Sequence, residues 1–430
     1  MMKKRRTFAL LVLSVLLVFL SNSFAKEGVL KGMPDPAIIS DGDNSFYIFA
    51  TGKGLPIYHS DNLVDWEPVG TVFDSPVPAW SKEAVPETEG IWAPDIVKLN
   101  NKYYVYYAVS SFGSQRSVIG VARNTTLDHT SPDYKWEDQG LVMESYPGKC
   151  DFNAIDPAAF QQKDGRAFMV WGSFWGGIKS VELNPETGKT LDENPKIESV
   201  ASRPHHRAHA IEGAYMVKHG DFYYLFVSWD NCCDGAESTY KVLVGRSENP
   251  LGPYVDFKGV PMTQGGGTLV LANNDNWRGP GHNSVLTTDK GSWIVHHTYD
   301  TFKLESQRIL QIRPIYWGRD GWPVVGEPLS KNNPMTTRAA DVVEDDMLGS
   351  WRLSFDYGPE SVIDLLKGGK IANHKGAWWK VDGNVLQLFW PGKPPTDGSD
   401  PDHCFVEMSL DSFVGRDQAG AVIRGKKLEY

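Results

Sequence analysis

A short motif recurs five times along the chain, and this repeat constrains the fold more than any other feature. Each copy is a brief apolar stretch, followed about 10 residues later by a run rich in aromatic and β-branched residues. Aligning the copies on their apolar pairs places five positions in register, at intervals of about 56 to 70 residues. These positions hold Asp35, Ala93, Asp156, Glu212 and His282.

The aromatic and β-branched runs predict strands. They cover residues 46–51, 102–108, 167–171, 222–227 and 293–297, each flanked by turn residues such as Gly, Asn, Asp or Lys. No long segment has the 3.6-residue apolar period of a helix. Five units of about 60 residues, each with three or four antiparallel strands, predict an all-β fold, a five-bladed β-propeller.

In a propeller, the repeated positions of the sequence are brought to one end of the central channel. Radial packing buries the faces of each small sheet and shortens its exposed edges. The innermost strand of each blade lines the central channel, so the residue that opens this strand lies at the channel mouth. We therefore expect the five aligned positions to converge, although they are far apart in the sequence.

The ends of the chain differ from the repeats. Residues 1–25 have a basic start, an apolar run from Phe8 to Leu20 and a small-residue cleavage site, which predicts a secretory signal peptide. We expect export to the periplasm or the medium. No later segment approaches the ~18 apolar residues of a membrane span, so no membrane association is expected. The propeller is predicted to cover residues 26–331.

A second domain is predicted over residues 332–430. A polar, Pro-containing linker from Lys331 to Arg338 precedes it, and alternating strands with Asp-Gly turns follow. This pattern predicts a small antiparallel β-domain that is either a carbohydrate-binding module or a structural cap. The sequence shows no clear row of exposed aromatic residues, which slightly favours the cap.

The charge and residue composition indicate which kinds of molecule the protein can bind. The net charge is -10 with both signs interspersed, which argues against nucleic acid and suits a neutral substrate. We expect a monomer. Most of the 15 Trp residues should belong to sheet cores, and some could stack on sugars. The four cysteines are interpreted as structural; three pairings are possible, and a bridge between the adjacent Cys232 and Cys233 would need unusual backbone geometry.

Three of the aligned positions carry carboxylates: Asp35, Asp156 and Glu212. An Asp before Pro is usually a turn residue, but three acids at one repeat position repel one another and have no packing rationale. Glycoside hydrolysis needs two carboxyl groups in opposite protonation states, and crowding with desolvation produces such states. Asp95 lies two positions out of register, so we interpret it as a supporting or structural residue.

His282 is the fourth polar residue of the aligned set. It could be a core histidine, an acid or base, or a metal ligand. One imidazole among carboxylates on a channel axis suits a hydrated hard cation such as Ca²⁺, with water as the remaining ligands. A zinc site would need several His or Cys residues at ligand spacing, and none is found.

The motifs resemble those of glycoside hydrolase family 43, specifically the endo-acting α-1,5-L-arabinanases. The matching stretches are residues 35–36, 58–66, 92–95, 153–157, 171–175, 211–213, 228–247 and 279–283. Residues 413–425 resemble the C-terminal β-barrel-like domain of longer members. Members often carry His before the base and Ala-Pro after the acid, whereas here Pro34 precedes Asp35 and Gly213-Ala214 follows Glu212.

The resemblance implies an inverting hydrolase that cleaves internal linkages of arabinan. It makes Asp35 the general base, Glu212 the general acid and Asp156 the residue that orients the acid and tunes its pKa. His282 matches the histidine that holds a central calcium ion. The arabinose subsites would be lined by Trp92, Gly113, Asn153, Ser173, Phe174 and Trp175.

Two other functions remain possible at this point. An exo-acting arabinofuranosidase or xylosidase would share the three carboxylates. A non-catalytic sugar-binding propeller is a different class, but a binding module has no reason to crowd acid, base and tuning carboxylates together.

Overall fold

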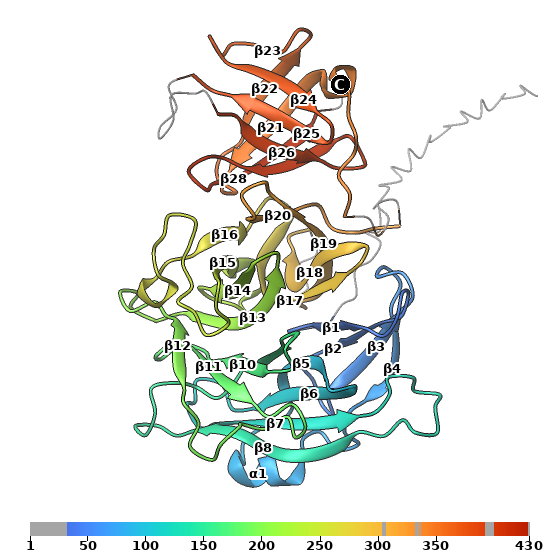
Figure 1. Ribbon diagram of the computed structural model, residues 1–430, viewed down its shortest axis with the longest axis vertical. Coiled ribbons are helices and arrows are strands. Elements are labelled where there is room, and N and C mark those ends of the chain that lie inside the picture. The colour runs from blue at the N-terminus through green and yellow to red at the C-terminus, as the bar shows by residue number, and fades with distance from the viewer. Residues whose placement is uncertain (1–31, 303–306, 332–334, 336, 392–399, 429–430) are drawn as a thin grey trace, which may run out of the picture.

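The computed structural model describes residues 32–302, 307–331, 335, 337–391 and 400–428, and within these it consists almost entirely of antiparallel sheet (Figure 1). The predicted signal peptide lies outside the described residues. Two bodies follow one another along the chain, a propeller and a closed barrel, so the predicted all-β architecture is confirmed.

Each propeller blade is a sheet of four strands in sequence order. Blade 1 contains β1 (Ala37–Ser40), β2 (Phe46–Phe49), β3 (Pro56–Ser60) and β4 (Glu67–Thr71). Blade 2 contains β5 (Trp92–Leu99), β6 (Lys102–Val109), β7 (Ser117–Asn124) and β8 (Glu137–Ser145). Blade 3 contains β9 (Ala158–Gln161), β10 (Ala167–Trp171), β11 (Ile178–Leu183) and β12 (Glu198–Ala201). Blade 4 contains β13 (Ile211–His219), β14 (Phe222–Trp229), β15 (Lys241–Ser247) and β16 (Thr268–Leu271). Blade 5 contains β17 (Trp277–Thr288), β18 (Gly291–Asp300), β19 (Ile309–Trp317) and β20 (Pro323–Val325).

Short helices occupy a few connections. They are α1 (Ala79–Ala84), η1 (Gly235–Glu237), η2 (Met262–Gln264) and α2 (Glu344–Met347). The second strands of the blades are the most apolar, because both of their faces pack against neighbouring blades. Tyr104 and Tyr106 of β6, for example, share one core cluster with Trp171 of blade 3. Because both faces of these strands are buried, their sequences are almost continuously apolar.

The entry to each inner strand has a common backbone conformation. One residue there has a positive φ in every blade: Asp35 (51°), Ala93 (39°), Asp156 (57°), Gly213 (55°) and His282 (49°). In each blade the residue two positions later pairs with the second strand, as Ala37 does with Phe49 and Tyr215 with Phe226. Gly213 therefore occupies the repeat position, and Glu212 precedes it by one residue. This corrects the sequence alignment, which had placed Glu212 in register.

The C-terminal domain is a closed antiparallel barrel, which confirms the predicted small β-domain. Its strands are β21 (Gly349–Phe355), β22 (Ser361–Leu366), β23 (Lys370–Ile371), β24 (Trp378–Asp382), β25 (Val385–Phe389), β26 (Asp402–Val406), β27 (Ser412–Arg416) and β28 (Val422–Lys427). Trp351 and Trp379 fill its core together with aliphatic residues. Closure removes the sheet edges that a domain of this size would otherwise expose.

The barrel lies against the outer strands of blades 4 and 5, β16 and β20 (Figure 1). The buried Arg416 of β27 donates hydrogen bonds to the carbonyls of Leu269 (3.1 Å) and Pro323 (2.8 Å). Tyr357 donates to the carbonyl of Val270 at 2.9 Å. The domain thus supplies partners for backbone groups at the propeller edge, as a cap would.

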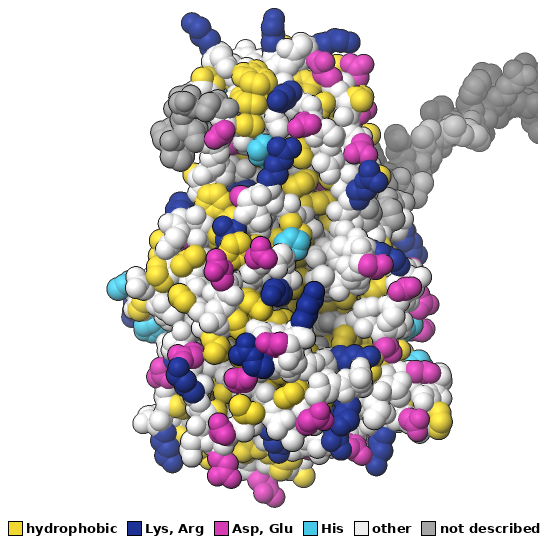
Figure 2. Space-filling view, viewed as in Figure 1, with side chains coloured by type: hydrophobic (Ala, Val, Ile, Leu, Met, Phe, Trp, Pro, Cys, Tyr) yellow, Lys and Arg dark blue, Asp and Glu magenta, His cyan; other side chains and the backbone are white. Residues whose placement is uncertain are grey.

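On the face shown in Figure 2, acidic and basic side chains are interspersed, as expected from the sequence. In the part of the chain that the structure describes, no helix is long and apolar enough to cross a membrane.

Candidate active site

A cavity of about 730 Å³ opens at one end of the propeller channel. All ten residues singled out from the sequence line it. They are Asp35, Trp92, Gly113, Asn153, Asp156, Ser173, Phe174, Trp175, Glu212 and His282. The expected convergence is therefore observed, with residues from all five blades around one space of the size of a small-ligand pocket.

Asp35 is surrounded by hydrogen-bond donors and positive charge. Thr51 Oγ1 donates to its Oδ2 at 2.6 Å. His282 Nδ1 and Arg308 Nη1 lie 3.5 Å and 3.6 Å from its Oδ1. Burial alone would raise the pKa of this carboxyl, but the neighbouring positive charges outweigh burial and hold the pKa well below its usual range. Asp35 is thus ionised, as a general base must be.

The pKa of Asp156 is shifted in the opposite direction to that of Asp35. Burial raises the pKa of the Asp156 carboxyl to about 7, with His282 opposing the shift and the negative charges of Glu212 and Asp35 adding to it. Its Oδ2 accepts a hydrogen bond from the backbone N–H of Gly213 at 3.2 Å. One buried carboxyl therefore titrates near neutral pH while another stays ionised.

Glu212 is held at both of its carboxylate oxygens. Ser173 Oγ donates to Oε2 at 2.6 Å, and the buried Tyr240 donates its hydroxyl to Oε1 at 2.9 Å. The side chain is half-buried and faces the cavity. Two donors from different blades fix the direction in which this carboxyl points.

His282 is close enough to all three carboxyls to be affected by their charge. Burial alone would lower the pKa of its imidazole, but Asp35, Asp156 and Glu212 together raise it. Its backbone N–H donates to Ser228 Oγ at 2.8 Å. The surroundings favour a positive charge on or beside this ring, which either a proton or a bound cation would supply.

Within the described ranges, His282 has one imidazole and three nearby carboxyls around it as possible cation partners. Among the described residues, no group of three or more His, Cys, Asp or Glu side chains is arranged to hold a metal ion. Calcium accepts water as a ligand readily, so the one-imidazole arrangement expected from the sequence is compatible with this geometry.

The predicted subsite residues offer both apolar and polar surface. Trp175 is 38% exposed and Phe112, which also lines the cavity, is 90% exposed, so both can present ring faces to a ligand. Asn153 is buried, and its Oδ1 accepts a hydrogen bond from Ser117 Oγ at 2.7 Å. Asn153 therefore has a structural partner as well as a place in the wall.

Asp95 takes the supporting role expected of it. It does not line the cavity but accepts a hydrogen bond from the backbone N–H of Ala159 at 2.7 Å, which joins blade 2 to blade 3. Burial raises the pKa of its carboxyl to about 7.

Several site residues were missed from the sequence. Arg308 follows the fifth repeat, and His297 lies in a second strand, where its Nδ1 is 3.1 Å from the backbone N of Asp35 and accepts that hydrogen bond. Tyr240 immediately precedes a third strand, β15. None opens an inner strand, so the repeat gave no signal for them; only the His-His pair at 296–297, an unusual feature in an apolar run, could have drawn attention.

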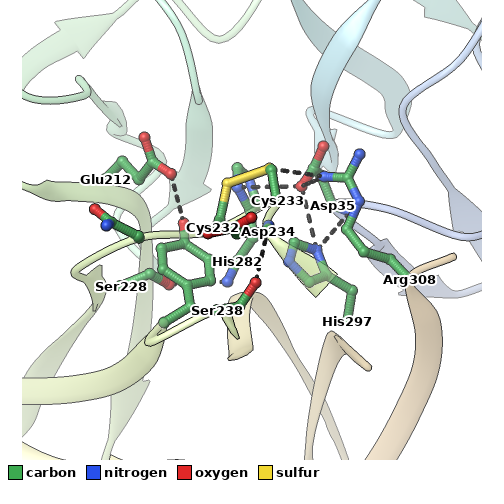
Figure 3. Close-up of a disulfide and its surroundings, with 12 residues drawn as sticks. Asp35, Glu212, Ser228, Cys232, Cys233, Asp234, Ser238, His282, His297 and Arg308 are labelled. Atoms are coloured by element: carbon green, nitrogen blue, oxygen red, sulfur yellow. Dashed lines mark hydrogen bonds and ion pairs between the residues drawn. A yellow bond between two sulfur atoms is a disulfide. The ribbon is translucent and has the colours of Figure 1, made fainter. Parts of the chain in front are cut away.

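The cysteines also differ from expectation. Cys232 and Cys233 form a disulfide with each other, with Cα atoms 3.8 Å apart, on the cavity wall (Figure 3). The required unusual backbone is present, since Cys233 has a φ of 67°. Cys150 and Cys404 are not joined by a disulfide.

A cavity of this size, with one carboxyl whose pKa is lowered, one whose pKa is raised and a third held by two hydrogen-bond donors, has the groups that define a glycoside hydrolase. The family model described as Glycosyl hydrolases family 43 matches residues 26–323. The chain therefore belongs to glycoside hydrolase family 43.

Its relatives include enzymes of both cleavage modes. The chain is 40% identical over 301 residues to the extracellular exo-alpha-(1->5)-L-arabinofuranosidase ArbA of Cellvibrio japonicus, covering 68% of this chain and 86% of the relative. It is 36% identical over 336 residues to the extracellular endo-alpha-(1->5)-L-arabinanase 1 of Bacillus subtilis, covering 75% and 99%. The solved Cellvibrio cellulosa alpha-L-arabinanase in complex with arabinohexaose is 39% identical, with a TM-score of 0.65, covering 69% of this chain and 95% of that one.

Proposed function

We propose that this protein hydrolyses α-1,5-linked arabinan, cleaving internal linkages with inversion of configuration. The observation that carries the proposal is the convergence of Asp35, Asp156 and Glu212 on one cavity, with the pKa of Asp35 lowered and that of Asp156 raised, in a chain related to arabinan-cleaving enzymes. Arabinan is neutral, which agrees with the interspersed surface charge.

Each carboxylate has a part in a single displacement. Asp35 takes a proton from a water molecule, which attacks the anomeric carbon from the face opposite the leaving group. Glu212, oriented by Ser173 and Tyr240, gives a proton to the leaving oxygen. Asp156 titrates near pH 7 and accepts the backbone N–H of Gly213, the residue after Glu212, so it lies where it can orient the acid.

A cation beside His282 is part of the proposal. His282 would hold it through its imidazole, with water as the other ligands. When bound, a calcium ion would supply positive charge and ordered water next to the carboxylates. Metal analysis of the purified protein before and after chelation tests this, and full activity in a metal-free sample would contradict it.

The stereochemical outcome can be observed directly. Inversion converts an α-linkage to a β-configured reducing end. Proton NMR of the first turnovers on an α-1,5-arabino-oligosaccharide should show the β-anomer before mutarotation. An initial α-anomer would contradict the single-displacement assignment.

Exo cleavage is the second candidate, because the 40% identical relative is named as an exo-acting enzyme. The size of early products on linear arabinan separates the two. We expect mixed oligosaccharides at low conversion. A single short product from the start would replace endo with exo cleavage, and binding without release of reducing sugar would indicate a non-catalytic sugar-binding propeller.

Export is proposed on two grounds. The basic and apolar start of the chain has the pattern of a signal peptide, and the relatives named above are called extracellular. Fractionation of the source cells should recover the activity outside the cytoplasm.

A further inference from the structure

The Cys232–Cys233 disulfide lies inside the proposed reaction site. Both cysteines line the cavity that Asp35 and Glu212 share. In the view of Figure 3 the disulfide lies between Glu212 on one side and the Asp35–Arg308 pair on the other. The space between an acid and a base is where a sugar ring must lie during hydrolysis.

This disulfide has little to contribute to global stability. A disulfide stabilises mainly by closing a loop in the unfolded chain, and a bridge between neighbouring residues closes almost none. The loop around it is also anchored without it. The N–H of Thr239 donates to the carbonyl of Asn231 at 3.0 Å, and Asp230 forms ion pairs with Arg203 (2.6 Å) and Lys241 (2.7 Å).

The backbone beside the bridge includes left-handed residues. Asp230 and Cys233 both have positive φ values, 70° and 67°. Left-handed conformations at residues other than glycine cost free energy and concentrate at functional sites. A strained loop with no stabilising purpose points to a role in the site itself.

The chemistry of the disulfide complements that of its surroundings. Asp35, Arg308, His282 and Glu212 are all charged or polar and can hold sugar hydroxyls. The two sulfur atoms donate no hydrogen bonds and form a soft, polarisable, apolar surface. A pentofuranosyl ring has an apolar C–H face as well as hydroxyls, so it can pack one face on the sulfurs while its hydroxyls meet the polar groups.

The disulfide also contacts Arg308, whose positive charge faces the proposed base Asp35. Arg308 Nη1 lies 3.6 Å from Cys233 Sγ and 3.6 Å from Asp35 Oδ1. The sulfur therefore contacts the same guanidinium nitrogen that faces Asp35 and limits the positions open to it. Loss of the bridge would free both the wall and Arg308.

We propose that the Cys232–Cys233 disulfide is a substrate-positioning element, an apolar platform for the arabinofuranosyl ring at the point of cleavage that also holds Arg308 beside Asp35. This inference rests on the proposed function. In this proposal the disulfide contacts the arabinofuranosyl ring at the cleavage point, which substrates of every length contain. It does not contact a distant subsite and is not needed for the stability of the fold.

The test compares wild type with a Cys232→Ala/Cys233→Ala double variant on α-1,5-linked arabinotriose and arabinohexaose. We expect kcat/KM to fall about tenfold to a hundredfold, by the same factor on both substrates, with the melting temperature within about 2 °C of wild type because so short a loop is closed. A defect that the longer substrate rescues would place the contact at a distant subsite and overturn the proposal. Unchanged kcat/KM, or a variant that does not fold, would also overturn it.

A phosphine reductant provides the second measurement. It converts the disulfide to two thiols while the phosphorus takes up oxygen from water. Reduction should lower kcat/KM of wild type and of the control Cys150→Ala alike, and leave the double variant unaffected. Equal sensitivity in the double variant would contradict the assignment. If wild type releases no sugar from arabinan, the proposed function is wrong. If wild type is active but the disulfide variants are unaffected, only the role proposed for the disulfide is wrong.

Discussion

At the scale of the residue, the site depends on one glycine. Gly213 occupies the repeat position in blade 4, with a φ of 55°, and a Cβ there would lie 3.2 Å from His282 Cα and 3.3 Å from its ring. Its backbone N–H also donates to Asp156. The blade that supplies the acid thus uses glycine where blades 1, 3 and 5 use Asp, Asp and His.

A matched pair of glycine variants tests this dependence. Gly213→Ala and Gly220→Ala both place a side chain at a left-handed φ, 55° and 57°, at a cost of about 1–3 kcal/mol in unfolding free energy. Only Gly213→Ala also meets His282, whereas nothing lies within 4 Å of a Cβ at Gly220. We expect similar losses by urea unfolding but at least a tenfold lower kcat, by misplacement, for Gly213→Ala alone. Equal activity in the two variants would contradict a positioning role.

The same glycine explains what the sequence could not provide. The repeat correctly brought Asp35, Asp156, Glu212 and His282 together, but it placed Glu212 in register when it is one residue early. A register shift between Glu212 and Tyr215 lies at this point of β13, as one does between Trp92 and Asp95 in β5 and between Gly281 and Ser284 in β17. Such irregularities next to active sites redirect side chains, and alignment on apolar pairs does not reveal them.

At the scale of the element, blades are joined by buried polar contacts as well as by apolar ones. Asp95 of β5 reaches across to the N–H of Ala159 in β9. The sequence identified it as supporting because it was out of register. Asp95 and Ala159 are 64 residues apart in the sequence, and they meet only because the two blades pack together. No local sequence pattern predicts that contact.

Asp95 should make stability pH-dependent. Its folded-state pKa is raised to about 7 by burial, against about 3.9 in the unfolded chain. The folded protein therefore binds the extra proton between these values, so the Asp95 contribution is greatest below pH ~4 and is lost as pH rises through 7. The unfolding free energy of wild type should fall over this range more steeply than that of Asp95→Asn. Parallel curves from urea titrations at each pH would refute the assignment.

At the scale of the whole molecule, the barrel completes the propeller edge. The sequence predicted its existence and its β character, yet not where it docks, because docking depends on single long side chains. Arg416 is the main example, since it reaches from β27 to two propeller carbonyls.

Arg416→Met should therefore weaken the fold. Its loss leaves the carbonyls of Leu269 and Pro323 without this donor, and buried unsatisfied groups cost about 1–3 kcal/mol each. Arg352→Met is the control, because Arg352 only forms a half-exposed pair with Glu360 at 3.2 Å, worth at most about 1 kcal/mol. Chemical unfolding that finds equal losses in both would argue against a capping role for the barrel.

The central claim is that the convergent carboxylates hydrolyse arabinan with Glu212 as the acid. Its most direct test is kcat on linear α-1,5-arabinan for Glu212→Ala, with circular dichroism to confirm folding. Because general acid catalysis contributes about 10²- to 10⁴-fold, we expect turnover to fall by that order while the fold is retained. A folded Glu212→Ala variant with wild-type turnover would contradict the account.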